Sequence, residues 1–146
     1  MKPKPMTWEF IKEICDRCDR DNSDLPICSI DQTRSDIIEN KYKEWKLSVG
    51  ENYLYDKIFG NNNYDAVLRL NDFPYNFETD IIHYVVWLRP SRNKYKFTPR
   101  MDKSLLDKIS EQLNNNDINN LDMIHFRNTP NNRTINSIDH YHLLFH

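Results

Sequence analysis

Small residues are scarce in this chain of 146 residues. Glycine occurs only at Gly50 and Gly60, and the single alanine is Ala66. Asparagine, by contrast, is frequent and forms the runs 61–63 and 114–116. Enrichment in Asn, Lys, Ile and Tyr with little Ala or Gly is typical of genes from AT-rich genomes. This bias indicates where the gene resides and leaves the function of the protein open.

The sequence also lacks a long apolar run and a strong excess of either charge. No stretch of 18 apolar residues exists, so we expect no membrane-spanning helix. Residues 1–5 lack the apolar region of a signal peptide, which favours a cytoplasmic protein. The net charge is −2 and no basic stripe stands out, which argues against general nucleic-acid binding.

Cysteine is limited to Cys15, Cys18 and Cys28. An odd count clustered near the N-terminus argues against a disulfide framework and favours a reducing intracellular setting. Cys15 and Cys18 form a C-x-x-C pair, and Cys28 is a third candidate zinc ligand. A structural zinc needs four ligands, however, and no nearby His or Cys supplies the fourth. We therefore expect three free thiols, no metal and no cofactor.

The first part of the chain, residues 7–60, is expected to form a helical cap. Thr7 caps one helix, Ser35 caps a second that Gly50 breaks, and a short third helix covers residues 51–59. Their inward positions are predicted to be Trp8, Ile11, Ile14, Cys15, Cys18, Ile37, Ile38, Tyr42, Trp45, Tyr53, Leu54 and Ile58. The length is typical of one domain, and no linker or repeat divides residues 1–146.

The second part, residues 65–146, combines β-favouring segments with one further helix. We expect strands near residues 65–70, 81–88, 122–127 and 137–145, with a turn at Pro74. The helix begins at Asp102 or Ser104 and ends near Leu113. Helices followed by such strands predict an α+β fold, in which N-terminal helices and one further helix pack on an antiparallel sheet. The last strand should pair inside that sheet.

The last predicted strand carries three of the five histidines. Because strand residues alternate between faces, one face carries His140, His142, Leu144 and His146, and the other carries Tyr141, Leu143 and Phe145. Two imidazoles two residues apart lie ~6–7 Å from each other, a spacing that suits two groups touching one substrate. The simpler interpretation is a half-polar strand on a solvated sheet face. Either way, His142 is expected on the polar face, where its substitution should leave the fold intact.

A family pattern runs through residues 65–146. Its parts are Pro74, residues 83–86 (His-Tyr-Val-Val), Asn128 and residues 136–142 (Asn-Ser-Ile-Asp-His-Tyr-His). The order of these parts resembles the histidine-triad superfamily of nucleotide hydrolases and transferases. That superfamily ends on His-φ-His-φ-His, where φ is apolar, after a strand with an early His and a helix. Here Leu144 takes the third histidine position, and leucine cannot donate a hydrogen bond.

The resemblance implies roles for individual residues. His142 falls on the nucleophile, which attacks phosphorus and forms a covalent nucleotidyl-histidine, while His140 and His83 shape the pocket. It also implies that Asn128 and Ser137 donate hydrogen bonds to phosphate oxygens, with Asn136 next to Ser137 at the substrate. Asn71 or Asp72 is implied to contact a ribose hydroxyl.

A second resemblance covers most of the chain. It rests on residues 71–75 (Asn-Asp-Phe-Pro-Tyr), residues 82–87 (Ile-His-Tyr-Val-Val-Trp) and residues 140–142 (His-Tyr-His). These blocks resemble an uncharacterised domain family common in fungi, which includes proteins described as N-acetylglucosamine-induced. That family supplies no settled activity, so this resemblance supports the fold more than the function.

Three functional interpretations follow. The first is an enzyme, a nucleotide phosphohydrolase or nucleotidyl transferase acting through a histidine. The second is a non-catalytic module that binds a nucleotide, a sugar phosphate or a protein partner, with a homodimer left open. The third is a metal site built from His83, His125, His140 and His142.

Overall fold

The computed structural model describes residues 4–21, 34–90, 98–113, 121–127 and 138–146. Three helices and four strands follow in the order α1, α2, β1, β2, α3, β3, β4. The strands form one antiparallel sheet in the order β1-β2-β4-β3, so β4 lies inside it. The expected α+β class is therefore confirmed, and so is the interior position of the last strand.

The four strands lie close to the predicted segments. Strand β1 covers Ala66–Leu70, β2 covers Ile82–Leu88, β3 covers Met123–Phe126 and β4 covers His140–Phe145. Every residue of β4 is buried, because it is flanked by β2 and β3 and covered on both faces. The expectation that the histidine face of this strand is polar is therefore wrong: His142 is only 4% exposed.

Helix α1, Trp8–Asp21, and helix α3, Lys103–Ser110, begin as the sequence predicts. The hydroxyl of Thr7 accepts a hydrogen bond from the Phe10 amide, and the Asp102 carboxylate accepts one from the Leu105 amide. These bonds satisfy amide groups that the first helical turn leaves without partners. The buried residues of α1 recur at helical spacing: Trp8, Ile11, Cys15 and Cys18.

Helix α2 is one continuous helix, Asp36–Phe59, which corrects the expected break at Gly50. A helical glycine costs only about 1 kcal/mol relative to alanine, and burial on both sides of it outweighs that cost. Buried contacts come from Tyr42 before the glycine and from Leu54 and Ile58 after it. Two residues expected to face inward are exposed instead, Ile37 at 67% and Tyr53 at 52%.

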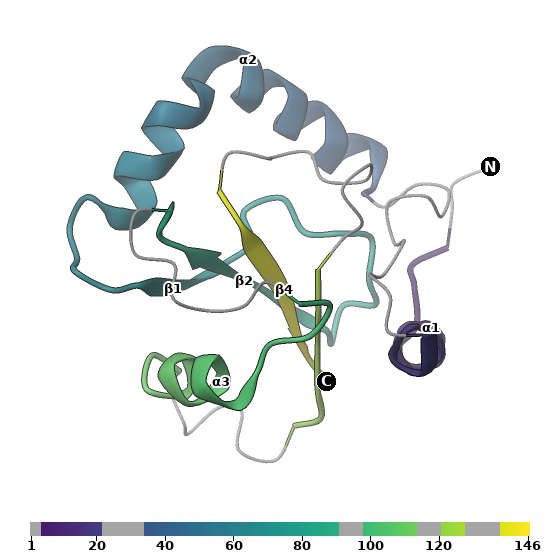
Figure 1. Cartoon of the computed structure of the whole chain (residues 1–146). Helices are drawn as coiled ribbons and strands as arrows, with labels where there is room; N and C mark the ends of the chain where they lie inside the picture. The colour runs from purple at the N-terminus through teal and green to yellow at the C-terminus, as the bar shows by residue number, and fades with distance from the viewer. Residues whose placement is uncertain (1–3, 22–33, 91–97, 114–120, 128–137) are drawn as a thin grey trace.

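The helices cover the sheet on two sides (Figure 1). Helix α3 packs on the face that carries Tyr141, Leu143 and Phe145, which we call the α3 face. Helices α1 and α2 pack on the other face, which carries His140, His142 and Leu144 and which we call the histidine face. None of the described helices is long and apolar enough to cross a membrane.

Candidate functional site

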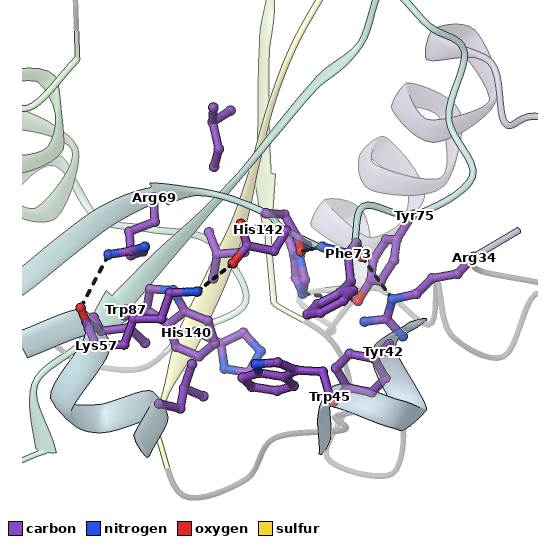
Figure 2. Close-up of a pocket in the computed structure, with 16 residues that line it drawn as sticks. Arg34, Tyr42, Trp45, Lys57, Arg69, Phe73, Tyr75, Trp87, His140 and His142 are labelled. Atoms are coloured by element: carbon purple, nitrogen blue, oxygen red, sulfur yellow. Dashed lines mark hydrogen bonds and ion pairs between the residues drawn. The ribbon is translucent and has the colours of Figure 1, made fainter. Parts of the chain in front are cut away.

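A pocket lies between α2 and the histidine face of the sheet (Figure 2). It encloses an empty volume of about 680 Å³, part of which is open to solvent. Its wall is formed by α2 and residues 69–75, and its floor by side chains of β2 and β4, which are Val85, Trp87, His140 and His142. A concave site that combines apolar and polar side chains is typical of small-molecule binding.

Strand register explains why the two histidines share the floor. His142 pairs with Val85 and His140 pairs with Trp87, so these four side chains project from the same face of the sheet. His83 pairs with Leu144 on that face, diagonally from His142. The rings of His83 and His142 are in contact, with centroids 5.0 Å apart, but His83 is not among the residues that line the pocket, whereas His140 and His142 are.

His83, His142 and Tyr75 form a buried hydrogen-bonded chain. The Tyr75 backbone nitrogen lies 3.3 Å from Nδ1 of His83, and Nε2 of His83 lies 2.8 Å from Nδ1 of His142. Nε2 of His142 lies 3.2 Å from the Tyr75 hydroxyl. The side-chain amide of Asn71 approaches the His83 ring at 3.3 and 3.5 Å. Both rings are thus held by several polar contacts.

Burial keeps these two imidazoles neutral. It lowers the pKa of His83 to about 3, with a further lowering from the Arg34 charge. Burial also lowers the pKa of His142 well below its usual value, helped by His83, His140 and Arg34. Removing an imidazolium from water into such an environment is costly, so the proton leaves instead.

His140 is held differently. Its Nδ1 lies 2.9 Å from the backbone carbonyl oxygen of Ile138. Its ring packs against Trp87 with centroids 4.8 Å apart and meets the His142 ring edge to face at 5.5 Å. A main-chain carbonyl and a large aromatic ring therefore fix the orientation of this imidazole at the pocket floor.

Aromatic rings form one wall of the pocket (Figure 2). The Phe73 ring contacts Tyr42 at 5.3 Å and Trp45 at 5.5 Å between centroids. Tyr42 is 5% exposed, and its buried hydroxyl has no hydrogen-bond partner within the part of the chain that the structure describes. A buried hydroxyl without a partner costs free energy, so this group lowers the stability of the wall in which it lies.

Basic side chains outnumber acidic ones in the pocket lining. Arg34 lies over the Tyr42 ring at 4.3 Å and donates to the Phe73 carbonyl at 2.9 Å. On the opposite side, Arg69 also lines the pocket, and Lys57 pairs with Asp72 at 3.1 Å (Figure 2). Three cations against one lining carboxylate give the pocket a positive balance that favours anions.

Only two of the residues expected to contact a substrate lie in the described part of the chain. Asn71 and Asp72 line the pocket, but the Asn71 amide contacts His83 and the Asp72 carboxylate contacts Lys57. Asn128, Asn136 and Ser137 lie outside the described residues, as do Cys28 and the 128–133 segment. Cys15 and Cys18 are buried free thiols, and burial raises the pKa of Cys15 to about 12.

The four-histidine metal site is excluded by the register. His125 pairs with Leu143 and accepts a hydrogen bond from the Met101 amide on the α3 face, opposite the other three histidines. Across the described ranges, one group of three His or acidic side chains brings its ligand atoms within 4.8 Å of each other, namely Glu78, Asp80 and His146. His146 is bonded to Asp80 at 2.7 Å and stacks on Trp8, well away from the pocket lining.

Several pocket residues were not anticipated from the sequence. They are Arg34, Tyr42, Trp45, Lys57, Arg69, Phe73, Tyr75 and Trp87. The sequence assigns Tyr42 and Trp45 only to helix packing, and it assigns Phe73 and Tyr75 only to the turn at residues 71–75. The available signal was the turn itself, because Phe73 and Tyr75 flank a proline close in sequence to His83.

Comparison with known proteins places the chain in a family. The family described as "Protein of unknown function (DUF3605)" matches residues 28–146, whereas no curated protein matches the chain. The crystal structure of HTC1 is similar to this fold, with a TM-score of 0.56 and 21% sequence identity. That similarity covers 95% of this chain and 84% of the other. Since the family match extends over most of the sequence and includes the pocket floor, the chain belongs to the DUF3605 family.

Proposed function

We propose that this protein is a histidine-dependent nucleotide phosphohydrolase or nucleotidyl transferase whose active site is the pocket between α2 and the histidine face. The observation that carries the proposal is the composition of the pocket: two oriented imidazoles on the floor, a cluster of aromatic rings in one wall and a surplus of basic groups. The histidine-triad-like assignment of residues 65–146 is part of this proposal.

The walls suit the two ends of a nucleotide. A planar base stacks favourably on rings such as Trp45 and Phe73, and such contacts contribute about 0.5–1.5 kcal/mol beyond area burial. A phosphate is favoured by Arg34, Lys57 and Arg69, and arginine can bind phosphate with two parallel hydrogen bonds. A sugar phosphate would use the same basic groups.

The floor suits attack on phosphorus. A neutral imidazole has a lone pair that can displace a leaving group and form a covalent phosphoryl intermediate. His142 on the floor and its hydrogen-bonded neighbour His83 are neutral at physiological pH because burial lowers their pKa values. This state requires no preceding deprotonation step.

A non-catalytic binding module is the second candidate, and Leu144 favours it. Leu144 is fully buried with Phe126 in the cluster under α1, so the third histidine position of the resemblance supplies no polar group to the pocket. Such a module would bind the same ligands through the same walls and release them unchanged.

Turnover assays distinguish the two candidates. The purified protein is incubated with adenosine 5′-phosphoramidate, a dinucleoside polyphosphate and a sugar nucleotide, and products are quantified by chromatography. The sugar nucleotide is included because of the resemblance to proteins described as N-acetylglucosamine-induced. We expect turnover that is lost when both floor histidines are changed to glutamine and retained in the control His125→Gln, on the α3 face.

Thermal shift measurements with the same ligands complete the test. A ligand that binds only the native state raises its stability whether or not it is converted. Binding without turnover would support the second candidate and refute the first. If the protein is folded but neither binds nor converts any of these ligands, both candidate functions are refuted.

A further inference from the structure

We infer that the Gln112 side chain closes the outer edge of the sheet at β1, and that without this contact two copies of the chain pair through that edge. The surface is therefore a latent docking edge, and the partner that fits it is a second copy of this chain. The inference is independent of the proposed function, because it rests on main-chain hydrogen bonding at the edge of the sheet and on no ligand.

Strand β1 has a row of main-chain groups that its neighbour β2 does not use. The sheet order places β1 at an edge. At its two ends, the Arg89 amide donates to the Asp65 carbonyl at 2.8 Å and the Asn71 amide donates to the His83 carbonyl at 2.9 Å. Bonded pairs alternate along an antiparallel ladder, so every second residue from 65 to 71 faces β2. The N–H and C=O groups of the residues between them point outward.

The side chain of Gln112 occupies part of this outward row. Its Oε1 accepts from the Leu68 N–H at 2.9 Å, and its Nε2 donates to the Ala66 carbonyl at 2.8 Å. A residue of a neighbouring strand would satisfy these edge groups with the same pair of bonds, one donated and one accepted. The Gln112 amide in turn donates to the Ile109 carbonyl at 2.9 Å, so the end of α3 holds the side chain against the edge.

The rest of β1 carries few of the features that keep sheet edges from pairing with other chains. Such features include lysine, proline and bulges. The sequence of β1 is Ala-Val-Leu-Arg-Leu, and its register with β2 is unbroken. Leu70, at the end that Gln112 does not reach, is 61% exposed. In the part of the chain that the structure describes, the Gln112 amide is the group that bonds to the outward side of β1.

Two β1 edges match each other in one antiparallel register. With Leu68 opposite Leu68 of the second copy, Ala66 of each copy lies opposite Leu70 of the other, and the outward groups of all three residues bond across the interface. The one charged residue, Arg69, then lies opposite Val67, so no like charges meet. A two-fold pairing of this kind uses the same surface on both copies and closes as a dimer. The side-chain amide at the end of α3 prevents it, because that amide occupies the central N–H group.

The oligomeric state of Gln112→Ala tests the inference. Sedimentation velocity and light scattering are measured over a range of protein concentrations, with circular dichroism to confirm folding. We expect Gln112→Ala to double its mass at concentrations where the wild type does not change. The control is Glu111→Ala, which removes a side chain of equal length from the neighbouring exposed position and should behave as the wild type. Adding Leu70→Pro removes an outward N–H that β2 does not use, so Gln112→Ala with Leu70→Pro should be monomeric again.

Three results would overturn the inference. They are a folded Gln112→Ala that associates no more than the wild type, equal association in Glu111→Ala, and a dimer that persists when Leu70→Pro is added. If Gln112→Ala does not fold, Gln112→Glu takes its place, because a carboxylate still accepts from the Leu68 amide but cannot donate to the Ala66 carbonyl. The same three results apply to that variant.

Hydrogen exchange at the Leu68 amide is a second measurement. In the wild type this amide should be protected at every protein concentration, because its acceptor belongs to the same chain. In Gln112→Ala it should exchange roughly tenfold faster in dilute solution, as the loss of one hydrogen bond implies, and regain protection as dimers form. A rapidly exchanging Leu68 amide in the wild type would overturn the inference, as would unchanged protection in dilute Gln112→Ala.

Discussion

The two faces of the sheet share the same four strands but differ in what they bury. The α3 face is filled mainly by aliphatic and aromatic side chains of β2, β4 and α3. The histidine face places two imidazoles of β4 and one of β2 under α1, α2 and the pocket. Strand alternation alone produces this contrast, because neighbouring residues of β4 project to opposite faces.

The contrast separates packing from chemistry. On the α3 face, burial of apolar area stabilises the fold directly, by about 25 cal/mol per Å². On the histidine face, each buried imidazole needs hydrogen-bond partners to offset its desolvation, and the Tyr75, His83 and His142 chain supplies them. Substitutions on the first face should therefore change stability, and those on the second should also change chemistry.

The largest effect is expected from a cavity on the α3 face. Leu143→Ala should lower the free energy of unfolding by about 2–5 kcal/mol, because Leu143 is fully buried in the α3 cluster. Urea unfolding measures this loss, and the folded variant should bind ligand as the wild type does. The control Leu47→Ala, at a position 90% exposed on α2, should change stability by less than about 0.5 kcal/mol. A loss below about 1 kcal/mol in Leu143→Ala would mean that this face is not closely packed.

Acid should destabilise the protein through one histidine on each face. Burial lowers the pKa of His83 to about 3, and the charge of Arg34 lowers it further. Burial lowers the pKa of His125 to about 4, and the charge of Arg100 lowers it further. Groups with depressed folded pKa values take up protons on unfolding, so their stabilising effect is present above pH ~6.5 and is lost as the pH falls. Between pH 7.5 and pH 5, each should contribute a loss of about 2 kcal/mol.

Glutamine variants test the acid effect site by site. The difference in unfolding free energy between pH 7.5 and pH 5 should shrink by about 2 kcal/mol in His83→Gln and by a similar amount in His125→Gln. The two changes should add, because the side chains lie on opposite faces of the sheet. An unchanged pH dependence in either variant would show that the histidine concerned is solvated in the folded protein.

Much of the fold follows from the sequence. Alternation and β-favouring residues locate all four strands, and Thr7, Ser35 and Asp102 mark helix starts. The continuity of α2 does not follow from the sequence, because Gly50 is a local helix-breaking signal and the packing on both sides of it is not local. Burial of the histidine face does not follow either, because imidazoles are usually half exposed and only the position of α2 reveals what covers them.

The site was only partly predictable. The period of a strand places His140 and His142 together, and antiparallel pairing brings His83 beside them. The main-chain groups that hold two of these rings, the Tyr75 amide at His83 and the Ile138 carbonyl at His140, are encoded by no residue pattern. The basic and aromatic walls come from segments distant in sequence, so their convergence depends on how α2 lies on the sheet.

Arg34 and Lys57 should contribute unequally to anion binding on the histidine face. Both cations have an acidic partner, Glu39 at 3.3 Å from Arg34 and Asp72 at 3.1 Å from Lys57. Arg34 lies over two aromatic rings and its side chain is largely buried, so Arg34→Gln should weaken binding of adenosine monophosphate roughly tenfold, about 1.4 kcal/mol. Lys57 is more exposed, so Lys57→Gln should cost less than about 1 kcal/mol. Isothermal titration calorimetry measures the affinity of both variants for adenosine monophosphate. Arg100→Gln, outside the pocket, is the control and should leave affinity unchanged. Equal losses in all three variants would indicate a general charge effect rather than a site.

The sharpest comparison uses one buried tyrosine hydroxyl on each side of the sheet. Tyr141, on the α3 face, donates to the Thr98 carbonyl at 2.6 Å and accepts from the Thr98 amide at 3.0 Å. Tyr141→Phe should therefore destabilise the protein by about 1–3 kcal/mol, since it leaves those main-chain groups without a partner. Tyr42, in the pocket wall, has no such partner among the described residues.

Tyr42→Phe should therefore act in the opposite direction. Removing an unsatisfied hydroxyl should raise the stability of the unliganded protein by about 1 kcal/mol, measured by urea unfolding. If a ligand supplies the missing partner, the same variant should bind it several-fold more weakly, so its thermal shift with adenosine monophosphate should shrink. A gain in stability with unchanged binding would place the ligand away from Tyr42. A loss in stability would show that the hydroxyl already has a hydrogen-bond partner in the unliganded protein.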